Sequence, residues 1–162
     1  IRKECPWATT GRFGGRKPNI ITSLELRSEE MEIINLRIQE KYKKIEESEV
    51  RFEEYMLDDA EYAIVAFGSA ARIAKKSIEI ARSQGIKAGL LRPITLWPFP
   101  TKEVQKLGEK MKGILSLEIN DGQMVEDIRL AVAGRVPVQH FGRLGGIIPD
   151  PDEVVDAIKR LF

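Results

Sequence analysis

The sequence of 162 residues contains one cysteine, Cys5, and one histidine, His140. A single cysteine cannot form an internal disulfide, and alone it cannot hold an iron–sulfur cluster or a structural zinc ion. No segment reaches the roughly eighteen uncharged apolar residues that a membrane helix needs, and no secretory signal pattern opens the chain. We therefore expect a cytoplasmic protein that has no membrane partner.

Asparagine and glutamine are also scarce, with three and five residues, whereas Lys, Glu, Arg and Ile are abundant. This balance favours a heat-adapted source. Apolar residues make up 43% of the chain and charged residues 31%, which is typical of a soluble globular protein. The length allows one sizeable domain and a small appendage.

The net charge is only +1, but it is unevenly spread. Residues 1–28 carry six basic and two acidic side chains, whereas residues 29–61 carry five basic and twelve acidic ones. No segment has the concentrated basic face with interleaved aromatic residues that nucleic-acid binding requires, so we expect no nucleic-acid partner. Because the chain starts at Ile1, we interpret it as a piece of a longer polypeptide.

Residues 62–68 (YAIVAFG) form a continuous apolar segment, typical of a strand that is covered on both faces in a parallel sheet. Ser69 is the predicted N-cap of the helix that follows, and Gly85 suits the left-handed conformation at its carboxyl end. Residues 86–91 then resume an apolar strand. A strand, a helix and a strand within about thirty residues predict a right-handed parallel crossover.

The same alternation continues to the carboxyl terminus. Pro100 and Thr101 are predicted to start a helix that ends at Gly113, and residues 114–119 form the next strand. Asp121 is the predicted N-cap of a helix that ends at Gly134, and residues 138–141 form the last strand. The last helix is predicted to begin with a capping box of Asp150, Pro151 and Glu153. Four strands alternating with four helices predict an α/β fold, a three-layer, doubly wound and mostly parallel sheet. In such sheets ligands and partners bind beyond the carboxyl ends of the strands.

An amphipathic helix is predicted to precede this unit, over about eighteen residues from Ser28. Its apolar stripe has helical spacing, with acidic residues in the first turn and lysines near the last, as the helix dipole favours. The stripe consists of Met31, Ile34, Ile38, Tyr42 and Ile45, and the lysines are Lys41, Lys43 and Lys44. Two interpretations remain open: the stripe binds another subunit, or it covers the protein's own core. Residues 50–57 partly alternate and predict an edge strand.

Residues 1–27 contain a stretch rich in glycine and basic residues, formed by Gly11, Arg12, Gly14, Gly15, Arg16, Lys17 and Pro18. Backbone N–H groups and guanidinium groups of such a stretch can grip a phosphate or carboxylate. Because no strand precedes these glycines and no clear helix follows directly, a connecting loop is the favoured interpretation.

No catalytic constellation emerges. We expect His140 to be a satisfied core or edge histidine rather than a base. Glu118, Asn120 and Asp121 follow one strand and could ligate a hard cation, although Asp121 is well placed as a helix cap. Ser69 lies between a strand and a helix, but the Gly-x-Ser-x-Gly pattern of a nucleophile elbow is absent.

Two sets of residues are candidates for binding. Trp97 and Phe99 lie in a proline-stiffened loop at the predicted sheet edge, where large aromatic side chains are often interface anchors, although they could equally cover the core. Gly68, Ser69 and Arg92 could bind a small anion or nucleotide at a helix N-terminus.

Four motifs, in this order and spacing, closely resemble the carboxyl-terminal region of the alpha subunit of 2-oxoacid:ferredoxin oxidoreductases. They are residues 60–71 (AEYAIVAFGSAA), 91–100 (LRPITLWPFP), 118–125 (EINDGQMV) and 142–149 (GRLGGIIP). The resemblance covers about residues 50–162 and implies one antiparallel edge strand, for which residues 50–56 are the candidate. More distantly, this unit resembles the carboxyl-terminal domain of transketolase.

The resemblance implies a thiamine-diphosphate-dependent enzyme that converts a 2-oxoacid and coenzyme A to acyl-coenzyme A and CO₂ and passes electrons to ferredoxin. It implies that thiamine diphosphate and iron–sulfur clusters serve the whole complex and that none is bound by this chain. The implied partners are a beta subunit, further gamma and delta subunits, and ferredoxin and coenzyme A through the complex. No catalytic residue and no metal ligand carries over.

We therefore expect residues 1–27 to be the tail of an upstream domain, residues 28–57 a linker helix with an edge strand, and residues 58–162 the α/β domain. The interface residues that the motifs suggest are Trp97, Phe99, Gln123 and Arg143. The leading hypothesis is an assembly region. The alternatives are the small-anion module and a scaffold unrelated to oxidoreductases.

Overall fold

The structure is a computed structural model that describes residues 11, 13–15, 17–18, 20 and 22–161. It divides into two compact units, residues 1–41 and 42–162. In the first unit, a short 3₁₀ turn, Phe13–Gly15, precedes helix α1, Ser28–Ser48, which continues into the second unit. Cys5, Arg12 and Arg16 lie outside the described residues.

Helix α1 is longer than predicted, with 21 residues, and this changes the charges of its last turn. The predicted lysines lie earlier in the helix, and the last turn carries no basic residue. None of its residues is buried, and Ile33 and Leu36 are 62% and 60% exposed. The expectation that lysines complement the carboxyl end of the dipole was therefore wrong.

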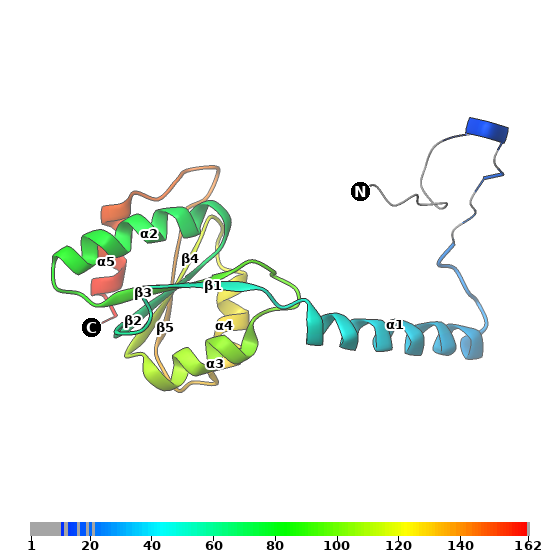
Figure 1. Cartoon of the computed structure of the whole chain (residues 1–162), viewed down its shortest axis with the longest axis horizontal. Helices are drawn as coiled ribbons and strands as arrows, with labels where there is room; N and C mark the ends of the chain where they lie inside the picture. Colours follow the sequence, from blue (N-terminus) through cyan, green and yellow to red (C-terminus); the bar gives the residue numbers. More distant parts are fainter. Residues whose placement is uncertain (1–10, 12, 16, 19, 21, 162) are drawn as a thin grey trace. The chain divides into compact units, whose positions relative to one another are not determined.

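A five-stranded sheet with the order β1-β3-β2-β4-β5 lies at the centre of the second unit (Figure 1). Its strands are β1, Phe52–Tyr55; β2, Tyr62–Ala66; β3, Ala88–Pro93; β4, Gly113–Glu118; and β5, Val138–Gly142. Strands β3, β2, β4 and β5 are parallel, and β1 pairs antiparallel with β3 at the edge. The mostly parallel α/β fold and the antiparallel edge strand are confirmed.

Helices cover both faces of the sheet (Figure 1). These are α2, Gly68–Ser83; α3, Thr101–Lys110; α4, Met124–Val132; and α5, Pro151–Lys159. Strand β2 shows why: Ile64 and Ala66 pack in a cluster with residues of α2 and α5, whereas Ala63 and Val65 pack in a cluster with residues of α3 and α4. The unbroken apolar sequence of β2 thus reflects burial on both faces, as predicted.

Two predicted helix boundaries were wrong. Ser69 is not the cap of α2, because the helix already begins at Gly68 and the N-cap residue is Phe67, whose backbone is extended. Gly113 does not end α3, which stops at Lys110; it is the first residue of β4. At α5 the capping box of Asp150, Pro151 and Glu153 is confirmed.

Candidate functional site

The carboxyl ends of the parallel strands bring three segments together: the turn after β2, the loop after β3 and the turn after β4. At this edge a pocket of about 140 Å³ is lined by Phe67, Leu96, Phe99, Glu118, Gln123, Met124 and Asp127. Phe99 also lines a larger groove of about 750 Å³, whose floor includes Val50, Phe52, Trp97 and Pro98. The pocket and the groove, which adjoin at Phe99, therefore lie at the sheet edge where ligands and partners were predicted to bind.

Glu118, the last residue of β4, is fully buried and lines the pocket. Its carboxylate accepts a hydrogen bond from the Ser116 hydroxyl at 2.8 Å. It also accepts the backbone N–H groups of Gln123 at 3.1 Å, Met124 at 2.9 Å and Val125 at 3.0 Å. These are the first N–H groups of α4, which have no partner inside the helix. Glu118 thus caps α4 from outside the helix.

The ionised form of Glu118 is favoured despite its burial. Burial raises its pKa, but the hydrogen bonds from the Met124 N–H, the Ser116 hydroxyl, the Gln123 N–H and the Asn120 side chain together lower it below its ordinary value. Both oxygen atoms of this carboxylate already accept hydrogen bonds from groups of the domain itself. Glu118 is therefore an anion that positions a helix, and it has little capacity left to exchange protons with a substrate.

This arrangement corrects the prediction for Asp121. The N-cap residue of α4 is Gln123, without a side-chain cap, and Asp121 is exposed. Asn120 makes a local turn, because its side-chain oxygen accepts the Gly122 N–H at 2.7 Å. Among the residues that the structure describes, no cluster of three or more His, Cys, Asp or Glu side chains could hold a metal ion. Sequence reasoning missed the role of Glu118; the available signal was an acid at the end of an otherwise apolar strand.

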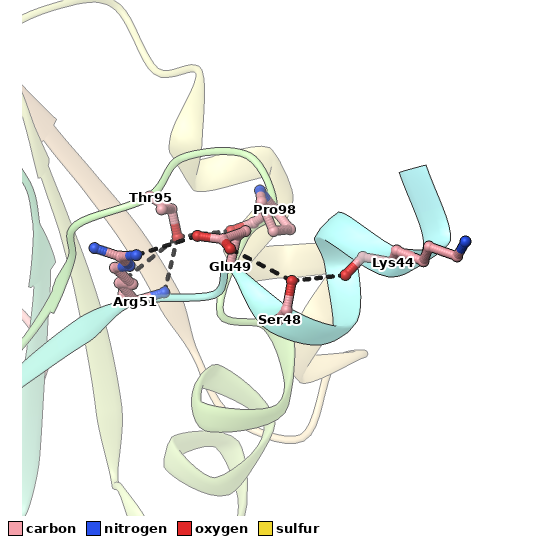
Figure 2. Close-up of polar contacts among 6 residues, drawn as sticks. All are labelled: Lys44, Ser48, Glu49, Arg51, Thr95 and Pro98. Atoms are coloured by element: carbon pink, nitrogen blue, oxygen red, sulfur yellow. Dashed lines mark hydrogen bonds and ion pairs between the residues drawn. The ribbon is translucent and has the colours of Figure 1, made fainter. Parts of the chain in front are cut away.

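Thr95 positions the loop that carries Trp97 and Phe99 (Figure 2). Its hydroxyl oxygen accepts the Arg51 N–H at 3.0 Å, and the hydroxyl donates to the Pro98 carbonyl at 2.9 Å. The backbone N–H groups of Ile94 and Thr95 both donate to the Arg51 carbonyl. The Trp97–Pro98 peptide bond is cis. The loop after β3 is therefore fastened to the segment before β1.

Nearby, Ser48 donates to the Lys44 carbonyl at 2.8 Å, and Glu49 pairs with Arg51 at 3.2 Å (Figure 2). The ring of Tyr42 meets Trp97 edge-on, with 5.3 Å between ring centroids. Trp97 nevertheless remains 54% exposed. The structure thus brings together Trp97, Phe99 and Gln123 around the pocket and the groove.

The three residues predicted to bind an anion have other environments. Arg92 donates to the Glu53 carboxylate at 2.9 Å, across the β1–β3 pair, and Lys75 contacts the same carboxylate at 2.5 Å. These contacts lower the pKa of Glu53, with Lys75 as the larger cause. Ser69 is exposed in the first turn of α2, and Gly68 has φ +55°. Arg92 is therefore paired with a carboxylate that it shares with Lys75, and its buried Nε has no hydrogen-bond partner among the described residues.

The remaining predicted residues lie on β5 and just after it. His140 does not meet the expectation of a satisfied histidine, because its buried Nε2 has no hydrogen-bond partner among the described residues. It lies against Gly122 and Gly142. Arg143 forms an ion pair at 3.4 Å with Glu153, which lies in the first turn of α5. Leu144, Ile147 and Ile148 follow in the loop after β5 and are 57%, 53% and 68% exposed.

Known proteins resemble this chain in sequence and in fold. The family model described as pyruvate:ferredoxin oxidoreductase core domain II matches residues 60–154. A ketoisovalerate oxidoreductase subunit, VorB, of Methanothermobacter thermautotrophicus is 42% identical over 160 residues, which cover 99% of this chain and 45% of the relative. The chain thus spans less than half the length of this relative.

Two solved structures show the same fold. A 2-oxoglutarate:ferredoxin oxidoreductase from Magnetococcus marinus matches 85% of this chain with a TM-score of 0.70 and 19% identity, over 24% of its own length. A split-gene transketolase matches 67% of this chain with a TM-score of 0.57 and 15% identity, over 41% of its own length. The likeness to transketolase that the sequence suggested is confirmed for the fold. By its sequence match, the chain belongs to the family of pyruvate:ferredoxin oxidoreductase core domain II.

Proposed function

We propose that this chain is an assembly region of the alpha subunit of a 2-oxoacid:ferredoxin oxidoreductase. The whole enzyme would use thiamine diphosphate and coenzyme A to convert a 2-oxoacid to acyl-coenzyme A and CO₂ while ferredoxin is reduced. The observation that carries this proposal is the 42% identity to a ketoisovalerate oxidoreductase subunit over nearly the whole chain. Since the chain covers 45% of that relative, catalysis would also require parts outside it.

The described residues do not fit the cofactors of such an enzyme. The fully buried carboxylate of Glu118 is occupied by hydrogen bonds that cap α4, so it is not available to activate thiamine diphosphate. An iron–sulfur cluster needs several thiolates, and the sequence has one cysteine. These groups would therefore be held elsewhere in the enzyme.

Exposed apolar side chains support a role in assembly. In the loop after β3, Ile94, Leu96 and Trp97 are 53%, 47% and 54% exposed. Leu144, Ile147 and Ile148 are exposed in the loop after β5, at the same edge of the sheet. Clusters of exposed apolar side chains with a polar rim mark interaction sites, and a tryptophan is among the strongest interface anchors. We assign the subunit contact to this edge, with Trp97, Phe99 and Gln123 in it.

A transplant tests the proposal. In the VorB subunit of Methanothermobacter thermautotrophicus, the region that aligns with this chain is replaced by the chain itself, and the hybrid is produced with the companion subunits of that enzyme. We expect a complex of the normal size in gel filtration, with 2-oxoacid-dependent electron transfer. A hybrid that folds but stays apart from the companion subunits would contradict the proposal.

The small-anion alternative has less support, because its cation, Arg92, is paired with Glu53 in the fold. Calorimetric titration of the chain with coenzyme A or nucleotides tests it, and we expect no heat of binding. The family match argues against the third hypothesis, an unrelated scaffold.

A further inference from the structure

The pocket and the groove adjoin at Phe99, which lines both of them. The apolar lining of the pocket consists of Phe67, Leu96, Phe99 and Met124, and that of the groove includes Trp97 and Phe52. Lys43, Glu46, Glu47, Lys102 and Glu103 line the groove as well. An apolar floor with a charged rim is the usual form of a surface that binds a polypeptide.

The size of the pocket restricts its occupant. At about 140 Å³, the pocket is smaller than the cavities of about 300–1,000 Å³ that hold cofactors and drug-sized ligands. The pocket therefore suits one long side chain of a partner polypeptide, while the groove, at about 750 Å³, has room for the residues beside it.

The charge of the pocket further restricts which side chain can occupy it. Its ionisable residues are Glu118 and Asp127, both acidic, and no basic residue lines it. Glu118 is occupied by its hydrogen bonds to α4, whereas the Asp127 side chain has no hydrogen bond or ion pair within the described part of the chain. Gln123, whose side chain is also without such a partner there, supplies an amide oxygen at the same wall. The pocket thus offers an anionic end without a counter-charge.

The walls distinguish arginine from lysine. A guanidinium group is planar, is weakly hydrated and stacks on aromatic faces, and its fork of N–H groups can bond a carboxylate and an amide oxygen together. Phe67 and Phe99 supply aromatic rings to the lining, and Asp127 and Gln123 supply the acceptors. A lysine ammonium group is more strongly hydrated and would lose more on entering a pocket lined by two phenylalanines.

We propose that this pocket binds an arginine side chain of a partner polypeptide, and that the groove seats the apolar residues that flank this arginine. The stem of the arginine packs on Leu96 and Met124, and its head bonds Asp127 and Gln123. This inference specifies the assembly role proposed above and rests on it for the identity of the partner as part of the oxidoreductase. The recognition chemistry itself can be tested on the chain alone.

The test is a titration of the ¹⁵N-labelled chain with n-butylguanidinium, followed by NMR. We expect saturable shifts of the backbone amide signals of Leu96, Gln123, Met124 and Asp127. Asp127→Asn should weaken binding about three- to fivefold, since Asp127 is exposed and an ion pair in contact with solvent contributes up to about 1 kcal/mol. The matched control is Glu126→Gln, which removes the same charge from the same turn of α4 at a residue that pairs with Arg129 and does not line the pocket.

Glu126→Gln should leave binding within about twofold, and uncharged n-butylurea, of similar shape, should bind at least tenfold more weakly. The proposal is overturned if n-butylguanidinium does not shift these signals, if n-butylurea binds equally well, or if the Asp127 and Glu126 variants behave alike. If the transplanted enzyme is active while n-butylguanidinium fails to bind, the arginine pocket is wrong and the proposed function stands. If n-butylguanidinium binds while the hybrid does not assemble, the pocket stands and the proposed partner is wrong.

Discussion

Replacement of Glu118 should destabilise this domain more than replacement of any exposed acid. In Glu118→Ala the first turn of α4 loses the acceptor of three N–H groups, and the Ser116 hydroxyl loses its partner. Each buried donor left without an acceptor costs about 1–3 kcal/mol, although water that enters the new cavity restores part of this. We expect a loss of about 3–5 kcal/mol in the free energy of unfolding, a large share of the stability of a small domain.

Glu118→Gln keeps the shape of the side chain and one acceptor oxygen, but its NH₂ group faces N–H donors. We expect a loss of about 2–4 kcal/mol. Urea unfolding followed by circular dichroism measures both variants, and Glu109→Gln, on the exposed surface of α3, should stay within about 0.5 kcal/mol of the unmodified chain. If Glu118→Gln also stays within that margin, the carboxylate does not hold α4 as described.

The effect of Glu118 should depend on pH in a defined direction. Because the pKa of Glu118 is lowered in the folded chain, the stability that it contributes is fully present above its ordinary pKa of 4.5 and is lost as the pH falls through the folded value. The difference between the unmodified chain and Glu118→Gln should therefore shrink below about pH 4.5. A difference that grows on acidification would contradict this assignment.

Three further changes test other parts of the structure. Thr95→Val removes the hydroxyl that joins Arg51 to Pro98 and should lower the free energy of unfolding in urea by about 1–3 kcal/mol. The control, Thr101→Val, should be nearly neutral, and equal losses in the two variants would show that the Thr95 hydroxyl does not fasten the loop. Gly142→Ala places a Cβ 2.2 Å from the Asn120 carbonyl oxygen and should lower stability by about 1–3 kcal/mol in the same assay, and an unchanged midpoint would contradict the close packing. Trp97→Ala should weaken subunit assembly of the hybrid enzyme in gel filtration by at least tenfold, and unaltered assembly would remove Trp97 from the interface. The chain alone should lose only about 0.5–1.5 kcal/mol in urea unfolding, because Trp97 is 54% exposed and its edge-on contact with Tyr42 is removed.

Local sequence signals predicted most of the fold. The unbroken apolar segment of β2 identified a strand that is buried on both faces, and the capping box at Asp150 marked the start of α5. The partial alternation before residue 58 identified the edge strand, although its antiparallel direction was implied only by the family resemblance. Each of these signals lies within a few consecutive residues and follows from the period or end chemistry of one element.

The caps of α2 and α4 could not be predicted in this way. The sequence contained a serine near one helix start and an aspartate near the other, but Ser69 lies inside its helix and Asp121 lies ahead of the N-cap. The acceptor for α4 comes from Glu118, five to seven residues before the N–H groups that it binds. Only the turn from β4 into α4 brings these atoms together.

The residues of the pocket could not be predicted from the sequence, because the order of the strands brings them together. They come from the segments after β2, β3 and β4, which are neighbours only because β2 lies between the other two strands. Strand order was not readable from the chain. Sequence reasoning named Phe99 and Gln123 through their motifs but had no reason to join Asp127 to them.

We have proposed that this region assembles the enzyme and does not perform its chemistry. The most direct test mixes the 162-residue chain alone with thiamine diphosphate, a branched or linear 2-oxoacid, coenzyme A and oxidised ferredoxin, and follows ferredoxin reduction by absorbance. We predict no reduction above the rate without protein, and restored reduction when the same sequence is part of the hybrid subunit with its companions. Ferredoxin reduction by the chain alone would contradict the claim.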